Sequence, residues 1–216
     1  MDTGALFASC WVHCEMVDYL TDPHNKALPY FDLPLQHVNS DLLRAMNRPY
    51  GRDQIERLLD EIRGRCPDAV IRATFIVGFP GETRAMFEEL FEFVERQKLH
   101  RVAGFAYSRE EGTPAAELPR QVTERTKYGR LDRLMSLQRD IALTRNSILM
   151  GSRQLVMLDC LQPDGVAIGR TKGDCPEIDQ QVYVEGESLQ VGQIGSVLID
   201  EVDGYDLRGR WAGGSR

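Results

Sequence analysis

Two patterns of hydrophobic positions alternate along the chain from residue 30 onward. Short, continuous apolar runs are separated by longer stretches in which apolar residues recur every three or four positions. The first pattern is typical of buried strands and the second of amphipathic helices. Strands are therefore predicted at 30–35, 69–77 and 101–107, and helices after residue 40, over 52–65, after residue 83 and over 123–150.

The residues at the predicted helix boundaries agree with this assignment. Asn39 or Ser40 can cap the first helix and Thr83 the third, because their side chains accept hydrogen bonds from the free N–H groups of a first turn. Residues 66–68, Cys-Pro-Asp, end the second helix. Residues 1–27 show no clear periodicity and are expected to be irregular.

Strands that alternate with helices predict a parallel sheet and an α/β fold. Only three such strands are evident, which is too few for a closed barrel. We therefore expect residues 28–150 to form a partial parallel (β/α) barrel. Its first strand should have an unpaired, apolar edge, and the chain should lack the strands that would precede it.

The pattern changes after Gly151. Five short strand-like runs follow, separated by turns rich in glycine, proline and aspartate, and no helical periodicity is present. These runs lie at 155–161, 166–170, 181–184, 194–202 and 206–211. Residues 151–212 are therefore predicted to form a small all-β barrel of the kind used in RNA and protein recognition.

Composition excludes several classes of protein. With 42% hydrophobic and 27% charged residues, the chain is an ordinary globular sequence. The apolar run at 4–12 is too short to span a membrane and lacks the flanks of a signal peptide. Five cysteines without regular spacing fit a reducing compartment. We expect a cytoplasmic protein with no membrane partner.

Polar or glycine-rich residues follow each of the three predicted parallel strands. These segments are 32–37 (DLPLQH), 78–82 (GFPGE) and 107–115 (YSREEGTPA). Barrels and open α/β sheets place their ligands at this end of the strands. Two of the segments also have a purely structural explanation: 78–82 is equally well a tight turn that needs glycine for its geometry, and a lone histidine such as His37 is more often a structural hydrogen-bonding group.

Three longer segments carry a specific resemblance. The segments 29–59 (PYFDLPLQHVNSDLLRAMNRPYGRDQIERLL), 72–94 (RATFIVGFPGETRAMFEELFEFV) and 105–119 (FAYSREEGTPAAELP) resemble the second half of the radical S-adenosylmethionine (SAM) domain of methylthiotransferases. The tail resembles their TRAM domain. Within the family, LPLQH and CPEIDQQVYV are more similar to the ribosomal-protein aspartate methylthiotransferase than to the tRNA-modifying members.

The resemblance implies cofactors and a cavity. The complete family enzyme uses S-adenosylmethionine and two [4Fe–4S] clusters to attach a methylthio group to an aspartate of a small-subunit ribosomal protein. By position along the strands, the residues implied to border the cofactor and substrate cavity are Gln36, His37, Arg72, Thr74, Ile76, Val77, Gly78 and Tyr107.

Cluster ligands are not expected in this chain. Cys10 and Cys14 have the first spacing of the family's CxxxCxxC signature, but Val17 stands at the third position. Three thiolates are needed to hold such a cluster while S-adenosylmethionine takes the fourth iron. We interpret the pair as incidental. Cys66, Cys160 and Cys175 lack partners at ligand spacing, and the chain alone is expected to be inactive and to need the N-terminal half of the enzyme as a partner.

Charge favours a protein over an RNA partner. From 152 to 212 the sequence has five basic and eleven acidic residues, a net charge of −6, within a chain of net charge −7. RNA binding depends on neutralising phosphates, whereas an acidic surface attracts a basic ribosomal protein. Direct RNA binding is therefore not expected. Two alternatives remain open: a fragment of a tRNA 2-methylthioadenosine synthase, and a non-catalytic module that docks on a ribosomal protein.

Overall fold

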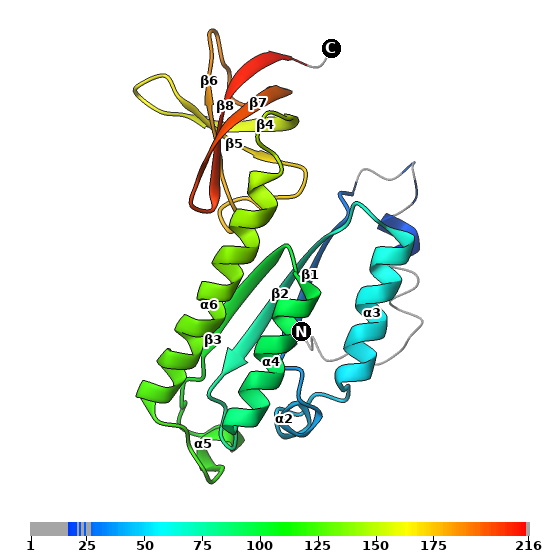
Figure 1. Ribbon diagram of the computed structural model, residues 1–216, viewed down its shortest axis with the longest axis vertical. Helices are drawn as coiled ribbons and strands as arrows, with labels where there is room; N and C mark the ends of the chain where they lie inside the picture. Colours follow the sequence, from blue (N-terminus) through cyan, green and yellow to red (C-terminus); the bar gives the residue numbers. More distant parts are fainter. Residues whose placement is uncertain (1–16, 21, 23, 25–26, 215–216) are drawn as a thin grey trace. The chain divides into compact units, whose positions relative to one another are not determined.

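The computed structural model describes residues 17–20, 22, 24 and 27–214 (Figure 1). It consists of two compact units whose boundary falls between Gln138 and Arg139, inside the long helix α6 (Glu124–Ser147). Cys10 and Cys14 lie outside the described residues. Residues 17–20 are helical, in a segment that the sequence predicts to be irregular.

The first unit contains a three-stranded parallel sheet in the order β1-β2-β3, as the sequence predicts. The strands are β1 (Tyr30–Gln36), β2 (Val70–Val77) and β3 (Arg101–Ala106). Helices α3 (Arg52–Arg65) and α4 (Arg84–Gln97) lie over one face of the sheet (Figure 1). In the part of the chain that the structure describes, β1 pairs with a strand on one side only.

Helices α2 (Ser40–Ala45) and α4 each begin next to a capping residue. Asn39 Oδ1 accepts hydrogen bonds from the first turn of α2, and Thr83 Oγ1 accepts one from the first turn of α4. Helix α4 ends at Lys98, which adopts the left-handed conformation of a helix C-cap. Helix α5 (Pro114–Glu117), capped by Thr113, lies in a segment that the sequence predicts to be loop.

The two faces of the sheet differ in burial. On the helix-covered face, Phe75 is fully buried and meets the buried Phe93 of α4 edge-to-face, with ring centroids 6.4 Å apart. On the other face, alternate residues of β2 are only half-buried, and Phe105 of β3 is 57% exposed. This is the burial pattern of strands from a barrel that has helices outside and an inner face facing open space.

The second unit contains a closed barrel of five strands in the order β4-β5-β6-β8-β7. The strands are β4 (Arg153–Leu161), β5 (Ala167–Thr171), β6 (Val182–Glu185), β7 (Ile194–Asp203) and β8 (Asp206–Gly214). Nine buried apolar side chains fill it, including Val156, Leu158 and Val197. Both predicted folds, the partial parallel barrel and the small β-barrel, are therefore confirmed.

The end of α6 packs with the barrel. Leu149, just beyond the helix, contacts the barrel core, and Asn146 Nδ2 donates a hydrogen bond to the Tyr205 carbonyl at 2.9 Å. The compact unit that contains the barrel therefore also includes the end of α6, and the predicted domain division at residue 150 stays a prediction. A closed barrel of this size leaves no strand edge to cover, so a helix end can seal only its open rim.

Substituting Gly169 should destabilise the barrel. A Cβ atom at this position would overlap the Met157 carbonyl oxygen and lie 2.8 Å from the Val156 side chain. Gly169→Ala is expected to cost about 2 kcal/mol, because crowding a close strand contact forces the backbone to move. In the same barrel, a Cβ at Gly214 would meet its nearest atom at 4.0 Å, so Gly214→Ala should be near neutral. Urea unfolding of both variants checks this; equal stabilities would contradict it.

None of the helices in the described residues is long and apolar enough to cross a membrane.

Candidate functional site

A cavity of about 330 Å³ lies at the carboxyl ends of the three parallel strands. Residues that follow β1, β2 and β3 all contribute to it, as expected for the ligand-binding end of a parallel barrel. The lining residues are Gln36, Ala45, Met46, Asn47, Arg48, Ile76, Phe79, Tyr107, Thr113, Pro114 and Ala115. Three of the predicted site residues, Gln36, Ile76 and Tyr107, are thus brought together.

The end of β1 is shaped by a bulge. Pro34 has no N–H group for the ladder, and the register with β2 shifts between Leu33 and Gln36. Gln36 has a left-handed backbone conformation, with φ +62°. The Pro34 carbonyl accepts hydrogen bonds from Gln36 Nε2 at 3.2 Å and Tyr50 Oη at 3.4 Å. Burial raises the pKa of the Tyr50 hydroxyl, which therefore stays protonated as a donor.

Two aromatic rings form part of the cavity wall. Phe79 and Tyr107 pack edge-to-face with centroids 5.3 Å apart, and the Lys127 ammonium lies 5.2 Å from the centroid of the Tyr107 ring. Tyr107 Oη is buried and has no hydrogen-bond partner among the described residues. Because a buried hydroxyl without a partner is costly, this atom is suited to bind a polar group of a ligand.

Backbone N–H groups of the loop 78–82 have hydrogen-bond partners within the protein. The Gly78 N–H donates to the Glu82 carboxylate, and the Gly81 N–H donates to the Arg120 carbonyl at 2.9 Å. A Cβ atom on Gly78 would overlap the stem of Lys127. Turn geometry and side-chain packing are sufficient to require this glycine, and its predicted role at the cofactor stays a prediction.

Glu82 is the central charged residue of a buried network that no sequence pattern reveals. Its side chain is fully buried; one carboxylate oxygen lies 3.0 Å from Arg130 Nη1, and the other lies 3.6 Å from His37 Nε2. Arg130 also donates to the Glu82 carbonyl at 3.2 Å. These contacts join the loop after β2, the end of β1 and helix α6 within the first unit.

His37 lies between the end of β1 and the start of α2. It is fully buried and does not line the cavity. Its Nδ1 accepts a hydrogen bond from the Asn39 N–H at 3.0 Å, so the neutral ring carries its proton on Nε2, which faces Glu82. Nε2 itself has no hydrogen-bond partner among the described residues, and the predicted role of His37 at the cofactor stays a prediction.

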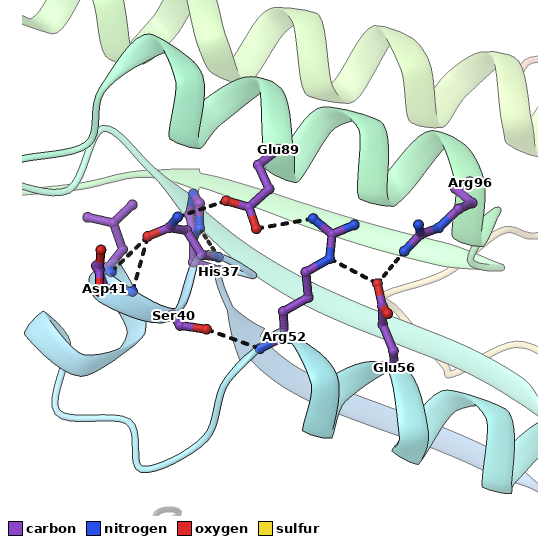
Figure 2. A network of polar contacts seen from close by, with 9 residues as sticks. His37, Ser40, Asp41, Arg52, Glu56, Glu89 and Arg96 are labelled. Atoms are coloured by element: carbon purple, nitrogen blue, oxygen red, sulfur yellow. Dashed lines mark hydrogen bonds and ion pairs between the residues drawn. The ribbon is translucent and has the colours of Figure 1, made fainter.

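A polar network extends from this point across the helices (Figure 2). Asn39 Nδ2 donates to one Glu89 oxygen at 2.7 Å, and Arg52 Nη1 lies 3.1 Å from the other. Arg52 Nε also binds Glu56 at 2.9 Å, and Glu56 in turn pairs with Arg96. The network therefore connects the start of α2 with α3 and α4, behind the cavity.

Acid should weaken this network through Glu56. The hydrogen bond from Arg52 lowers the pKa of Glu56 from its ordinary value of 4.5, with Arg96 contributing in the same direction. A lowered folded-state pKa adds stability above the ordinary value, and that stability is lost as the pH falls through the folded-state pKa. Glu56→Gln should therefore reduce the pH dependence of urea unfolding between pH 6 and 3. An unchanged pH profile would contradict the assignment.

The other predicted site residues lie away from the cavity wall. Arg72 and Thr74 are on the half-buried face of β2, where Arg72 Nη1 lies 2.8 Å from Asp32, but neither lines the cavity. Val77 is buried on the helix-covered face, and its carbonyl accepts a hydrogen bond from the Tyr107 N–H at 2.9 Å. Their predicted role at the cofactor stays a prediction.

No metal centre is formed by the residues that the structure describes, since no group of three or more His, Cys, Asp or Glu side chains in them could hold an ion. Cys66 is buried in the first unit, while Cys160 and Cys175 belong to the barrel.

Family comparisons agree with both units. Residues 14–94 match the radical SAM superfamily and residues 150–212 match the TRAM domain. The fold is similar to that of coproporphyrinogen III oxidase (HemN) from Escherichia coli, with a TM-score of 0.50 and 16% identity over 74% of this chain and 42% of that one. The protein is therefore of the radical SAM class, with a TRAM domain attached.

The most similar sequences show to which family of radical SAM proteins the chain belongs. The chain is 47% identical over 183 residues to the ribosomal protein uS12 methylthiotransferase RimO of Thermosynechococcus vestitus, covering 84% of this chain and 41% of the relative. It is 44% identical to the RimO protein of Clostridioides difficile, over 83% of this chain and 41% of that relative. The chain belongs to the radical SAM methylthiotransferase family and spans less than half the length of these relatives.

Proposed function

We propose that this chain forms the distal part of the radical SAM barrel and the TRAM domain of a methylthiotransferase that modifies an aspartate of ribosomal protein uS12. The observation that carries the proposal is the sequence identity of 42–47% to relatives of that name, which extends over most of this chain. The cavity at the strand ends and the acidic barrel support it.

The cavity has the chemistry that S-adenosylmethionine needs. Phe79, Tyr107 and Ile76 offer apolar and aromatic surface for the adenosine, and Tyr107 Oη and Gln36 offer polar groups. S-adenosylmethionine supplies, together with a reduced cluster, the radical chemistry of the family. In the proposed role the two rings exclude water, and Gln36 and the Tyr107 hydroxyl orient the bound molecule.

The described residues do not fit an iron–sulfur cluster, because they contain no three-ligand group. In the proposal, the two clusters of the family are held by residues outside those that the structure describes, including the N-terminal half of the enzyme. The half-buried inner face of β2 and the one-sided pairing of β1 are consistent with further strands that complete the barrel.

The barrel favours a basic protein partner. Its arginines include three that are held in ion pairs: Arg170 with Asp159, Arg208 with Asp203 at 3.1 Å, and Arg210 with Asp200 at 2.8 Å. The hydrogen bond that Arg208 donates to Asp203 raises the pKa of Arg208. Since these cations are already neutralised, the remaining acids dominate the surface field, which attracts a basic protein and repels RNA phosphates.

Deleting the gene in the organism that encodes it tests the proposal. We expect the methylthio group on uS12 to disappear while methylthiolated nucleosides in tRNA remain, as measured by mass spectrometry of both. A plasmid copy of the gene should restore the modification. Loss from tRNA instead would identify a tRNA 2-methylthioadenosine synthase, and no change in either would favour a non-catalytic module. The cytoplasmic location stays a prediction.

A further inference from the structure

Among the described residues that line the cavity at the strand ends, only Arg48 is charged. The other lining residues are apolar or carry neutral polar groups, and no carboxylate is among them. The chain as a whole has a net charge of −7, so the charge of this cavity is opposite to that of the chain. A cavity with a positive wall favours a ligand that carries a negative charge.

The backbone of Arg48 is fixed just beyond the end of helix α2. Asn47 has a left-handed conformation, with φ +56°, and its N–H donates to the Arg44 carbonyl at 3.1 Å. The Arg48 N–H donates to the carbonyl of the fully buried Leu43 at 2.8 Å. These two hydrogen bonds form a Schellman motif, and Pro49 restricts the Arg48 backbone further. The side chain of Arg48 therefore starts from a defined point beside the cavity.

The charge of Arg48 lies near the end of β1. Burial raises the pKa of the Tyr50 hydroxyl, and the positive charge of Arg48 acts in the opposite direction, an effect that falls off with distance. Tyr50 Oη lies 3.5 Å from the Leu35 carbonyl oxygen, and the next residue, Gln36, lines the cavity. The guanidinium is therefore close to the part of the cavity wall that β1 provides.

No carboxylate among the described residues neutralises Arg48. The hydrogen bonds and ion pairs between those residues do not include its side chain, and its Nε atom has no partner among them. Arg44, four residues earlier, differs, because its Nη1 lies 2.9 Å from Asp41 and both side chains are largely exposed. Since no such contact holds the Arg48 guanidinium, it can turn toward a ligand without breaking an ion pair.

We propose that Arg48 binds the side-chain carboxylate of the substrate aspartate in this cavity and thereby selects aspartate over an uncharged residue. A carboxylate that leaves water needs a counter-charge, and a guanidinium provides one together with two parallel N–H donors. S-adenosylmethionine has a sulfonium and an ammonium group against one carboxylate, so its net positive charge makes it the less suitable ligand for this cation. The identity of the substrate rests on the proposed function; the preference of the cavity for a carboxylate does not.

Titration of the full chain with N-acetyl-L-aspartate N-methylamide tests this preference. The only charge of this probe is on its side chain, and the asparagine counterpart has nearly the same shape without that charge. In spectra of the ¹⁵N-labelled protein we expect saturable shifts of the Arg48 and Gln36 signals. The asparagine probe should bind about tenfold more weakly, because a hydrogen bond between charged groups is lost. Non-saturable shifts, or equal binding of the two probes, would overturn the proposal.

Variants of two arginines separate a local contact from a general effect of charge. Arg48→Gln should reduce the affinity for the aspartate probe to that for the asparagine probe. Arg48→Lys should retain part of the preference, because the charge remains without the planar fork, and it keeps the test decisive where Arg48→Gln disturbs folding. Arg44→Gln removes the same charge from an exposed position outside the cavity and should leave both affinities unchanged.

Two results with these variants would contradict the assignment. Equal losses for Arg48→Gln and Arg44→Gln would show that only the overall charge matters. A loss of affinity for S-adenosylmethionine in Arg48→Gln, without a change in the preference between the two probes, would assign Arg48 to the carboxylate of the cofactor instead of the substrate.

Complementation of the deletion strain separates this inference from the proposed function. At equal protein levels, we expect a plasmid copy with Arg44→Gln to restore the methylthio group on uS12 and a copy with Arg48→Gln to fail, as measured by mass spectrometry. If Arg48→Gln restores it fully, the inference is wrong while the proposed function stands. If even the unaltered gene has no effect on uS12 but the aspartate probe binds through Arg48, the carboxylate site stands and its assignment to uS12 is wrong.

Discussion

Replacing Glu82 by glutamine should destabilise the first unit by about 3–5 kcal/mol, because a buried arginine is left without its counter-charge. The Glu82 carboxylate is fully buried, forms an ion pair with Arg130 Nη1 at 3.0 Å and accepts a hydrogen bond from the Gly78 N–H. Glutamine retains one acceptor oxygen but has no charge to compensate Arg130, whose side chain is only 12% exposed. The free energy of unfolding, measured with urea and followed by the helical circular dichroism signal, checks this.

A neighbouring ion pair provides the control. Arg133, one turn further along α6, makes two hydrogen bonds with Glu88, but both side chains are partly exposed. Glu88→Gln should therefore cost no more than about 1 kcal/mol. If Glu82→Gln costs as little as this control, Arg130 is solvated in the folded protein and the buried network is not what holds the loop.

The second large effect is expected for Gly78→Ala, at about 3 kcal/mol, from two causes that add. The residue has φ +76°, a conformation that costs an alanine about 1–2 kcal/mol. Its Cβ atom would also overlap the stem of Lys127, which is 2% exposed and cannot swing away without losing its packing. Thermal unfolding of the full chain measures the sum.

Gly112→Ala isolates the first cause. Gly112 has nearly the same backbone angle, φ +79°, but a Cβ atom there would have no neighbour within 4 Å. We expect this variant to lose only the backbone contribution, about 1 kcal/mol. Equal losses for the two variants would show that Lys127 moves aside, and the packing explanation for Gly78 would then be wrong.

Local sequence patterns account for the elements that were predicted well. Helix α3 is predicted at its observed bounds because Ile55, Leu58, Leu59 and Ile62 recur at helical spacing and all four are buried. The cap at Thr83 and the barrel strands follow from similarly local signals. Helix α5 was not predicted, since it is a single turn with too few residues to show a period.

The candidate site was predictable only in part. The position of Gln36, Ile76 and Tyr107 at strand ends is enough to bring them to one cavity, because parallel strands end at the same edge. The roles of Glu82 and His37 depend on contacts with each other and with Arg130, from three segments far apart in the sequence. No spacing rule connects such residues, so only the folded structure shows that they form one buried network.

The bulge in β1 limits how the sheet can grow. Beyond Leu33 the strand continues with Pro34, which has no N–H group and whose carbonyl already accepts hydrogen bonds from Gln36 and Tyr50. A strand added to this edge could form a regular ladder along the first half of β1 but would have to separate from it after Leu33. A further strand can therefore pair regularly only with the amino-terminal part of β1. The carboxyl-terminal part of β1, which contributes Gln36 to the cavity, is thereby protected from pairing with other chains.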